Sequence, residues 1–382
     1  AEGGTLRVSS GRFYQTGVTS EPDDISLQVS QGQVGGVFFN NPATAIGGSL
    51  TRPSGLGFFA ADDFSAGGFD HLVLGGNVLF DGQVNLQARG SLAVATGGVL
   101  QTVGDVALTA RHASLGKVFQ APLSPNQEQA AFLQEVNPFF FAPTTGTGSL
   151  TVEADLIDIG NLSFQGTGRA SFIAERGDIR GNGTLNLAGH LLMRAGQVYP
   201  VTGSVFTVSV YDPVGSGRGS AIFEGSGNKT LPLSAGGTLR VYASDITQDG
   251  VLRAPFGRIE LGWSGEGTRP QDFIAGTRAA IPLTRSLTLG ANSITSVSGV
   301  DPGTGRALLA PYGLSTDGVS WIDPAGVDIT AGGLSEKALL LGAQSITTEA
   351  GAQQDLRGGG DLLAYRFVSG TTGTKDILAN DS

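Results

Sequence analysis

The chain has 382 residues, of which 40% are hydrophobic, 15% are charged and 61 are glycine, and its formal net charge is −10. This hydrophobic content predicts a folded core and the glycines show no three-residue period, so disordered and collagen-like proteins are excluded. The acidic balance disfavours nucleic acids and anionic membranes as partners, because clusters of Lys and Arg bind both. Cysteine is absent, which excludes disulfides, thiolate catalysis and cysteine-ligated metals.

The first residues, AEGGTLRV, lack a methionine, and we interpret the chain as a piece of a longer precursor. Neither a signal peptide nor an apolar stretch of about 18 residues is found in the sequence. Apolar alternation begins at Leu6 and Val8 and is still present at residues 362–367. Because no Pro/Ser-rich linker interrupts it, we expect one continuous domain over residues 1–382.

Short segments of alternating apolar and polar residues predict β-strands along the chain. Val84, Leu86 and Ala88 fall on one face of an extended segment, and the residues between them fall on the other. The same pattern returns at Val106 and Leu108, 22 residues after Val84 and Leu86. A recurrence of about 20 residues leaves no room for helical crossovers, so it predicts strands stacked in parallel as the coils of an all-β solenoid.

Three segments interrupt the strand pattern and are expected to leave the solenoid as excursions, at about residues 117–149, 199–231 and 264–285. In the first, Ser124 is a suitable N-cap, Pro125 fits the first helical position and Pro138 stops the helix. We therefore expect the little helix of this protein to be confined near residues 125–137.

The first excursion also concentrates aromatic side chains, which are the usual anchors of interfaces. The candidate partner-binding residues are therefore Phe119, Phe132, Phe139, Phe140 and Phe141. Packing of these rings on the flank of the solenoid is the alternative. The second excursion contains two strand-like runs around a glycine-rich turn at residues 205–225 and predicts a projecting hairpin, whereas the third is irregular.

Two further repeats extend the solenoid pattern towards the C-terminus. Residues 173–179 align with residues 192–198 at an offset of 19, which predicts one coil between them. Residues 287–299 align with residues 339–351 at an offset of 52, with eight identical positions. The second repeat suggests that a larger unit is superimposed on the coils.

Residues with catalytic or metal-binding chemistry are scattered in the sequence. His71, His112 and His190 are expected to be solitary surface or turn residues. The pairs Asp23–Asp24 and Asp62–Asp63 place neighbouring carboxylates on opposite faces of a strand, which does not suit glycosidase chemistry. The GGGD sequence at Gly358 lacks the further glycine and adjacent copies of a calcium nonapeptide. We therefore expect no catalytic residue, metal site or cofactor.

Four segments resemble the filamentous-haemagglutinin-like large exoproteins of Gram-negative bacteria. They are residues 67–82, 231–262, 287–299 and 353–378, the last of which reads QQDLRGGGDLLAYRFVSGTTGTKDIL. The resemblance covers nearly the whole chain and is most specific in its C-terminal third. It implies a two-partner-secretion exoprotein, built as a right-handed parallel β-helix and secreted or displayed at the cell surface for adhesion, aggregation or display.

The same resemblance implies an outer-membrane transporter as the partner during secretion. The Asn-Pro-Asn-Gly motif of the family's secretion domain does not occur, and the NNPATAIGG sequence at Asn40 does not match it. Contact with the transporter is therefore expected through a region outside this chain. Other implied partners are a host or bacterial surface receptor, a polysaccharide, or further copies of the protein.

The alternative function is a carbohydrate-acting or polysaccharide-binding β-helix protein. The Asn-Thr-Asp and Gly-His-Gly motifs of polygalacturonase-type enzymes are absent, and RIE at Arg258 matches their Arg-Ile-Lys only loosely. These enzyme signatures are missing, and a fold alone does not assign a function. We therefore expect a protein that is not an enzyme. A groove lined with acidic and aromatic side chains would favour the alternative.

Overall fold

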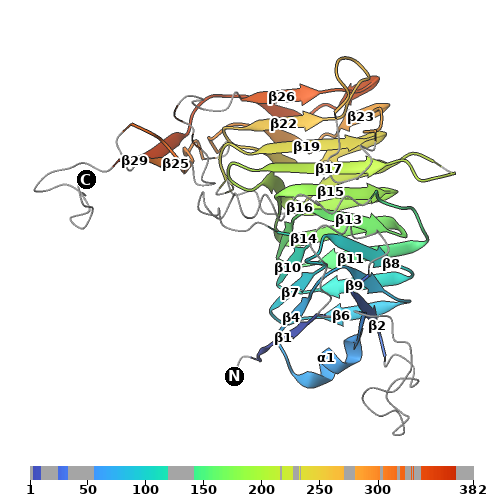
Figure 1. Ribbon diagram of the computed structural model, residues 1–382. Helices are drawn as coiled ribbons and strands as arrows, with labels where there is room; N and C mark the ends of the chain where they lie inside the picture. The colour runs from blue at the N-terminus through green and yellow to red at the C-terminus, as the bar shows by residue number, and fades with distance from the viewer. Residues whose placement is uncertain are drawn as a thin grey trace, which may run out of the picture.

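The computed structural model describes residues 3–9, 25–32, 56–118, 142–215, 217–226, 232, 234–270, 280–301, 304–315, 319–322, 328, 330 and 337–366. More than half of the residues lie in β-strands, these strands pair in parallel, and there is one seven-residue helix (Figure 1). The expected all-β class is therefore confirmed. No helix among these residues is both long enough and apolar enough to cross a membrane.

Most strands belong to three ladders, which we call the first, second and third faces. The first face contains β1 (Thr5–Val8), β4 (His71–Leu74), β7 (Ser91–Val94), β10 (His112–Leu115), β12 (Leu156–Ile159), the ends of β14 (Thr167–Gly181) and β16 (His190–Pro200), β21 (Val251–Arg253), β24 (Ile294–Ser296) and β28 (Gln353–Asp355). The third face contains β6 (Val84–Gln87), β9 (Asp105–Thr109), β11 (Gly148–Glu153), the beginnings of β14 and β16, β18 (Ser220–Gly225), β20 (Asp245–Asp249), β23 (Ser286–Leu289) and β27 (Ser345–Thr348).

The second face is a separate ten-stranded sheet. In spatial order it contains β3 (Gly57–Ala60), β2 (Leu27–Ser30), β5 (Val78–Phe80), β8 (Val99–Thr102), β13 (Leu162–Gln165), β15 (Gly183–Ala188), β17 (Val205–Tyr211), β19 (Thr238–Ala243), β22 (Arg258–Leu261) and β26 (Ala338–Leu341). The remaining strands, β25 (Leu309–Ser315) and β29 (Asp361–Arg366), form a separate parallel pair beside the stack (Figure 1).

Most successive strands visit the three faces in turn, and we call one such passage a coil. Each strand pairs in parallel with the strand of the next coil, so β6 pairs with β9 in the register Val84 to Val106 and Leu86 to Leu108. The 22-residue recurrence is thus confirmed. Because the alternation of side chains is the same in every coil, the inward residues form one continuous hydrophobic core.

The helix α1 (Ala61–Gly67) was not expected from the sequence. Asp62 and Asp63 occupy its first turn, where acidic side chains favour helix formation, and Gly68 ends it in the left-handed conformation at φ 72°. Ala61 and Phe64 are buried, so α1 packs its apolar side on the core. Because α1 lies at Ala61–Gly67, the expectation that helix is confined near residues 125–137 is wrong. Residues 125–137 themselves lie outside the described residues.

The two later repeats differ in how well they match the pairing. The 19-residue offset is confirmed where Asp178 pairs with Gln197, but Ile173 pairs with Arg194 because the register shifts between them. The 52-residue repeat is wrong as a stacking unit, since Leu287 pairs with Ile346, 59 residues later. Its two copies begin on different faces, one in β23 on the third face and the other in β26 on the second face. Similar sequences thus form a strand and the following turn on two different faces.

The predicted hairpin at residues 205–225 is also wrong. β17 lies in the second face between β15 and β19, whereas β18 lies in the third face between β16 and β20. Val208 and Phe223 are both buried. Each run therefore places apolar side chains in the core, whereas an isolated two-stranded hairpin has no core in which to bury them. In the first excursion, residues 148 and 149 belong to β11, and Thr144 donates a hydrogen bond to the Phe164 carbonyl.

We predict that Gly177→Ala destabilises the stack, because the new methyl carbon would lie 1.9 Å from the carbonyl oxygen of Asp155 in the preceding coil. The expected loss is about 1–3 kcal/mol of the free energy of unfolding, measured by chemical denaturation. The matched control is Gly358→Ala, where no atom lies within 4 Å of the added carbon. Equal stability of the two variants would contradict the close packing of coils at Gly177.

Candidate binding site

The outer surface of the first face carries a row of polar side chains from successive coils. Asp158 in β12, Arg180 in β14 and Tyr199 in β16 are register neighbours. Their inward neighbours Ile157 and Ile179 are fully buried, so the alternation of the strands directs this row away from the core, although Tyr199 itself is only 8% exposed. Parallel pairing thus brings together residues that are 22 and 19 positions apart in the sequence.

Asp158 is the centre of an ionic cluster in this row. Arg180 donates from Nε to Oδ1 of Asp158 and from Nη2 to Oδ2, the second bond at 3.0 Å. His112 Nε2 lies 2.7 Å from Oδ2 of the same carboxylate. Burial alone would raise the pKa of Asp158, but the hydrogen bonds from His112 and Arg180 outweigh it and hold this pKa below its ordinary value. Asp158 is therefore an ionised, fixed carboxylate.

A second carboxylate on the same face has the opposite electrostatic environment. Burial raises the pKa of Asp178, and hydrogen bonds from Gln197 and Tyr199 only partly oppose this effect. The Gln197 amide donates to Asp178 at 3.0 Å. Burial, together with the charge of Asp178, raises the pKa of Tyr199 to about 12. Two carboxylates on adjacent coils thus differ in how readily they take a proton.

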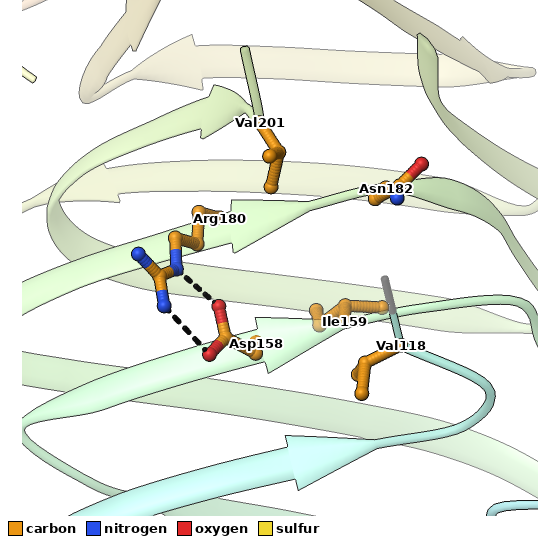
Figure 2. A pocket seen from close by; sticks show the side chains of 6 residues that line it. All are labelled: Val118, Asp158, Ile159, Arg180, Asn182 and Val201. Atoms are coloured by element: carbon orange, nitrogen blue, oxygen red, sulfur yellow. Dashed lines mark hydrogen bonds and ion pairs between the residues drawn. The ribbon is translucent and has the colours of Figure 1, made fainter. Parts of the chain in front are cut away.

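A pocket of about 270 Å³ lies beside the ionic cluster, where the first face turns into the second (Figure 2). Its lining combines three polar side chains with three aliphatic ones: Asp158, Arg180, Asn182, Val118, Ile159 and Val201. Figure 2 shows the Arg180–Asp158 pair on one side and Asn182 and Val118 on the other. The pocket therefore offers fixed charges, an amide and apolar surface to one small group.

Further along the first face, β21 contributes a buried cation. Arg253 is only 1% exposed, and neither its Nε nor its Nη1 has a hydrogen-bond partner in the described part of the chain. Burial lowers the pKa of this guanidinium, and the charges of Asp301, Asp355 and Asp178 oppose the effect. Arg253 thus adds positive charge beneath the surface that also carries Asp178.

The candidate partner-binding phenylalanines belong to the segment that follows Val118 in the sequence. Phe119, Phe132, Phe139, Phe140 and Phe141 all lie outside the described residues. Val118, which directly precedes that segment, lines the pocket. The pocket is therefore next to the last described residue before this segment.

Other residues considered from the sequence have structural contacts. The expectation of solitary histidines is wrong, because His71 and His190 each lie 2.9 Å from a serine hydroxyl of the next coil, Ser91 and Ser220. Asp62 and Asp63 are exposed in the first turn of α1, and Asp23 and Asp24 are outside the described residues. The described residues contain no group of three or more His, Asp or Glu side chains suited to a metal ion.

Opposite pH effects are predicted for the two carboxylates. Asp158 has a lowered pKa, so its contribution to stability is present above its unfolded pKa of 3.8 and is lost as the pH falls through the folded value. Asp158→Asn should therefore cost about 1.5–3 kcal/mol at neutral pH and flatten the acid limb of stability against pH.

Asp178 has a raised pKa, so ionisation in the folded protein is unfavourable and stability is lost as the pH rises from 3.8 through the folded value. Asp178→Asn should remove this loss, which makes it the matched control in denaturation at pH 3 to 7. The same pH profile for both variants would contradict the two environments.

Comparison of the chain with protein-family models, curated proteins and solved structures finds no match. The pocket and its charged row are therefore interpreted from their own geometry.

Proposed function

We propose that the protein is a right-handed parallel β-helix that forms a rod-like segment of a large, non-enzymatic exoprotein for adhesion, aggregation or display. The observation that carries this proposal is the continuous parallel stack with one core along its length. The ten strands on the second face are separated by nine spacings of about 4.8 Å, which gives a rod of ~43 Å. Such a segment contributes reach, and further coils extend it without changing its cross-section.

The proposed location is outside the outer membrane of a Gram-negative bacterium, either secreted or held at the cell surface. The resemblance of residues 67–82, 231–262, 287–299 and 353–378 to two-partner-secretion exoproteins supports this location. Export would use an outer-membrane transporter that recognises a region outside this chain. The absence of cysteine suits such a route, because no disulfide can form before translocation.

Recognition of a receptor is assigned to the irregular segments rather than to the regular coils. On the third face Thr247, Thr288 and Thr347 are register neighbours from three successive coils. A repeated polar ladder of this kind offers a partner little by which to choose one position over another. The segment with Phe119 and Phe132 interrupts that regularity and supplies large rings, which are common interface anchors.

A second candidate function, polysaccharide binding, is favoured by the pocket on the first face. Sugar rings present hydroxyl groups at their edges and C–H groups on their faces, and the pocket offers both complements. Asp158 and Arg180 can exchange hydrogen bonds with hydroxyls, and Val118 and Val201 provide apolar contact. The Asn182 side-chain amide makes no hydrogen bond within the described part of the chain, so it has donors and an acceptor to offer.

The adhesive proposal is tested by replacing residues 119–141 with a short Gly-Ser linker. We expect the stack to fold, because strands on both sides keep their partners, and cell adhesion or aggregation to fall at least about tenfold. Circular dichroism and thermal unfolding check the fold, and a binding assay on host matrix and bacterial cells checks adhesion. Unfolding of the variant would show that the phenylalanines pack on the flank, and unchanged binding would place recognition elsewhere.

The second candidate is tested with a glycan array and the variant Asn182→Leu. If the pocket holds a sugar, this variant should weaken retention on the preferred glycan by about tenfold or more, because a buried polar partner is lost. Thr247→Val is the matched control on the third face. Equal glycan retention by both variants would rule out the pocket as the site, and turnover of a glycan would contradict the non-enzymatic proposal.

A further inference from the structure

The strands of the second face carry very little charge. Within this ten-stranded sheet only β19 and β22 contain charged residues, and these are Arg240, Arg258 and Glu260. Parallel pairing places Arg240 beside Glu260, and Arg258 lies two positions before Glu260 in the same strand. The charge of the sheet is therefore gathered at one place, where two arginines and one glutamate give 2 − 1 = +1.

Glu260 holds both guanidinium groups on the outer side of the sheet. Its Oε1 lies 2.6 Å from Nε of Arg258, and its Oε2 lies 3.4 Å from Nε of Arg240. The hydroxyl of Tyr242 donates to Oε2 at 2.9 Å. Burial, followed by the charge of Glu260, raises the pKa of Tyr242, so this phenol keeps its proton as a donor. The Glu260 carboxylate is thus occupied by three partners and only 15% exposed.

Both guanidinium groups have hydrogen-bonding capacity left over. The side chains of Arg240 and Arg258 are 41% and 40% exposed. Their Nη atoms make no hydrogen bond to the part of the chain that the structure describes. The two Nη atoms of an arginine match the paired oxygens of a carboxylate, to which they donate in parallel. Each arginine therefore presents a free donor edge to solvent.

The acidic balance of the whole chain does not decide what binds at these arginines. Charges are screened over about 8 Å at physiological ionic strength, and the strands of the second face contain no acidic residue besides Glu260. Nucleic acids and anionic membranes are held by larger clusters of Lys and Arg than this one. Arg240 and Arg258 therefore suit an anionic ligand of low charge density.

Hydroxyl groups continue the row of Arg240 along the stack. Thr184 of β15 pairs with Thr207 of β17, which pairs with Arg240 of β19 (Figure 1). Both threonines are partly exposed, and their hydroxyls make no hydrogen bond within the described ranges. Consecutive coils are about 4.8 Å apart, so hydroxyls and then a guanidinium group follow one another at a regular spacing. A sugar chain along this row meets partners for its hydroxyls and a cation for a carboxylate.

We propose that Arg240 and Arg258, held by Glu260, bind carboxylate groups of an acidic polysaccharide that lies along the second face. The carboxylates accept hydrogen bonds from the free Nη edges of the arginines, and neighbouring sugars exchange hydrogen bonds with the two threonines of the row. The site shares no residue with the pocket beside Asp158. It therefore stands whether or not that pocket holds a sugar and whether or not the protein is an adhesin.

Titration calorimetry of the full chain with oligosaccharides of mannuronic acid tests this site, and mannose oligosaccharides of the same length and linkage are the neutral comparison. We expect the acidic ligand to bind at least about tenfold more tightly. Arg240→Gln and Arg258→Gln should each weaken its binding by about fivefold or more, because a charged donor pair is lost. Thermal unfolding checks the fold of both variants. Arg240→Lys keeps the charge without the planar fork and should also weaken binding.

The matched control is Arg194→Gln on the third face. Arg194 is 39% exposed, but it lies between the carboxylates of Glu224 and Glu175, so its charge is already balanced. This variant should leave the affinity for the acidic ligand unchanged, and so should the pocket variant Asn182→Leu.

Four results would each overturn the inference. They are no binding of the acidic ligand, equal binding of the neutral one, equal losses in Arg240→Gln and Arg194→Gln, and a loss confined to Asn182→Leu, which would place the glycan in the pocket. Binding of dextran sulfate without binding of mannuronate would overturn the assignment to carboxylates.

Discussion

Parallel backbone pairing between successive coils is the constraint on which the rest of this structure depends. Each strand must match the register of the coil on either side, so inward and outward positions are inherited along the whole stack. The core from Leu72 to Leu287 follows from this inheritance, as does the close approach of Gly177 to Asp155. A slip of a whole strand by one residue would turn its apolar side chains to solvent.

The same constraint explains how a chain with few charged residues builds a polar site. Asp158, Arg180 and Tyr199 are distant in the sequence but become neighbours because their strands pair. The adjacent coils supply the hydrogen-bond donors of each carboxylate. Asp158 receives hydrogen bonds from His112 and Arg180, whereas Asp178 receives them from the amide of Gln197 and the phenol of Tyr199. Local stacking thus gives two identical side chains different proton affinities.

The sequence predicted what depends on periodicity and missed what depends on tertiary context. The alternation around Val84 and its return at Val106 identified the strands and their pairing. Similarity between residues 287–299 and 339–351 was misleading, because strand-and-corner sequences resemble one another on every face. The α1 helix was missed because its seven residues are too few for a clear helical period. The ionic cluster was missed because Asp158 and Arg180 become partners only after the register of β12 and β14 is known.

The cover formed by α1 has a consequence for the order in which the molecule folds. In a stack of repeats each coil contacts only its neighbours, so folding can begin wherever a coil has additional stabilising contacts. Phe64 and Ala61 supply contacts at the β1 and β3 end that do not require a preceding coil. We expect this end to act as the nucleus, from which order propagates towards β26–β28 in the direction of the polypeptide chain. A chain that emerges N-terminus first is then expected to fold as it appears.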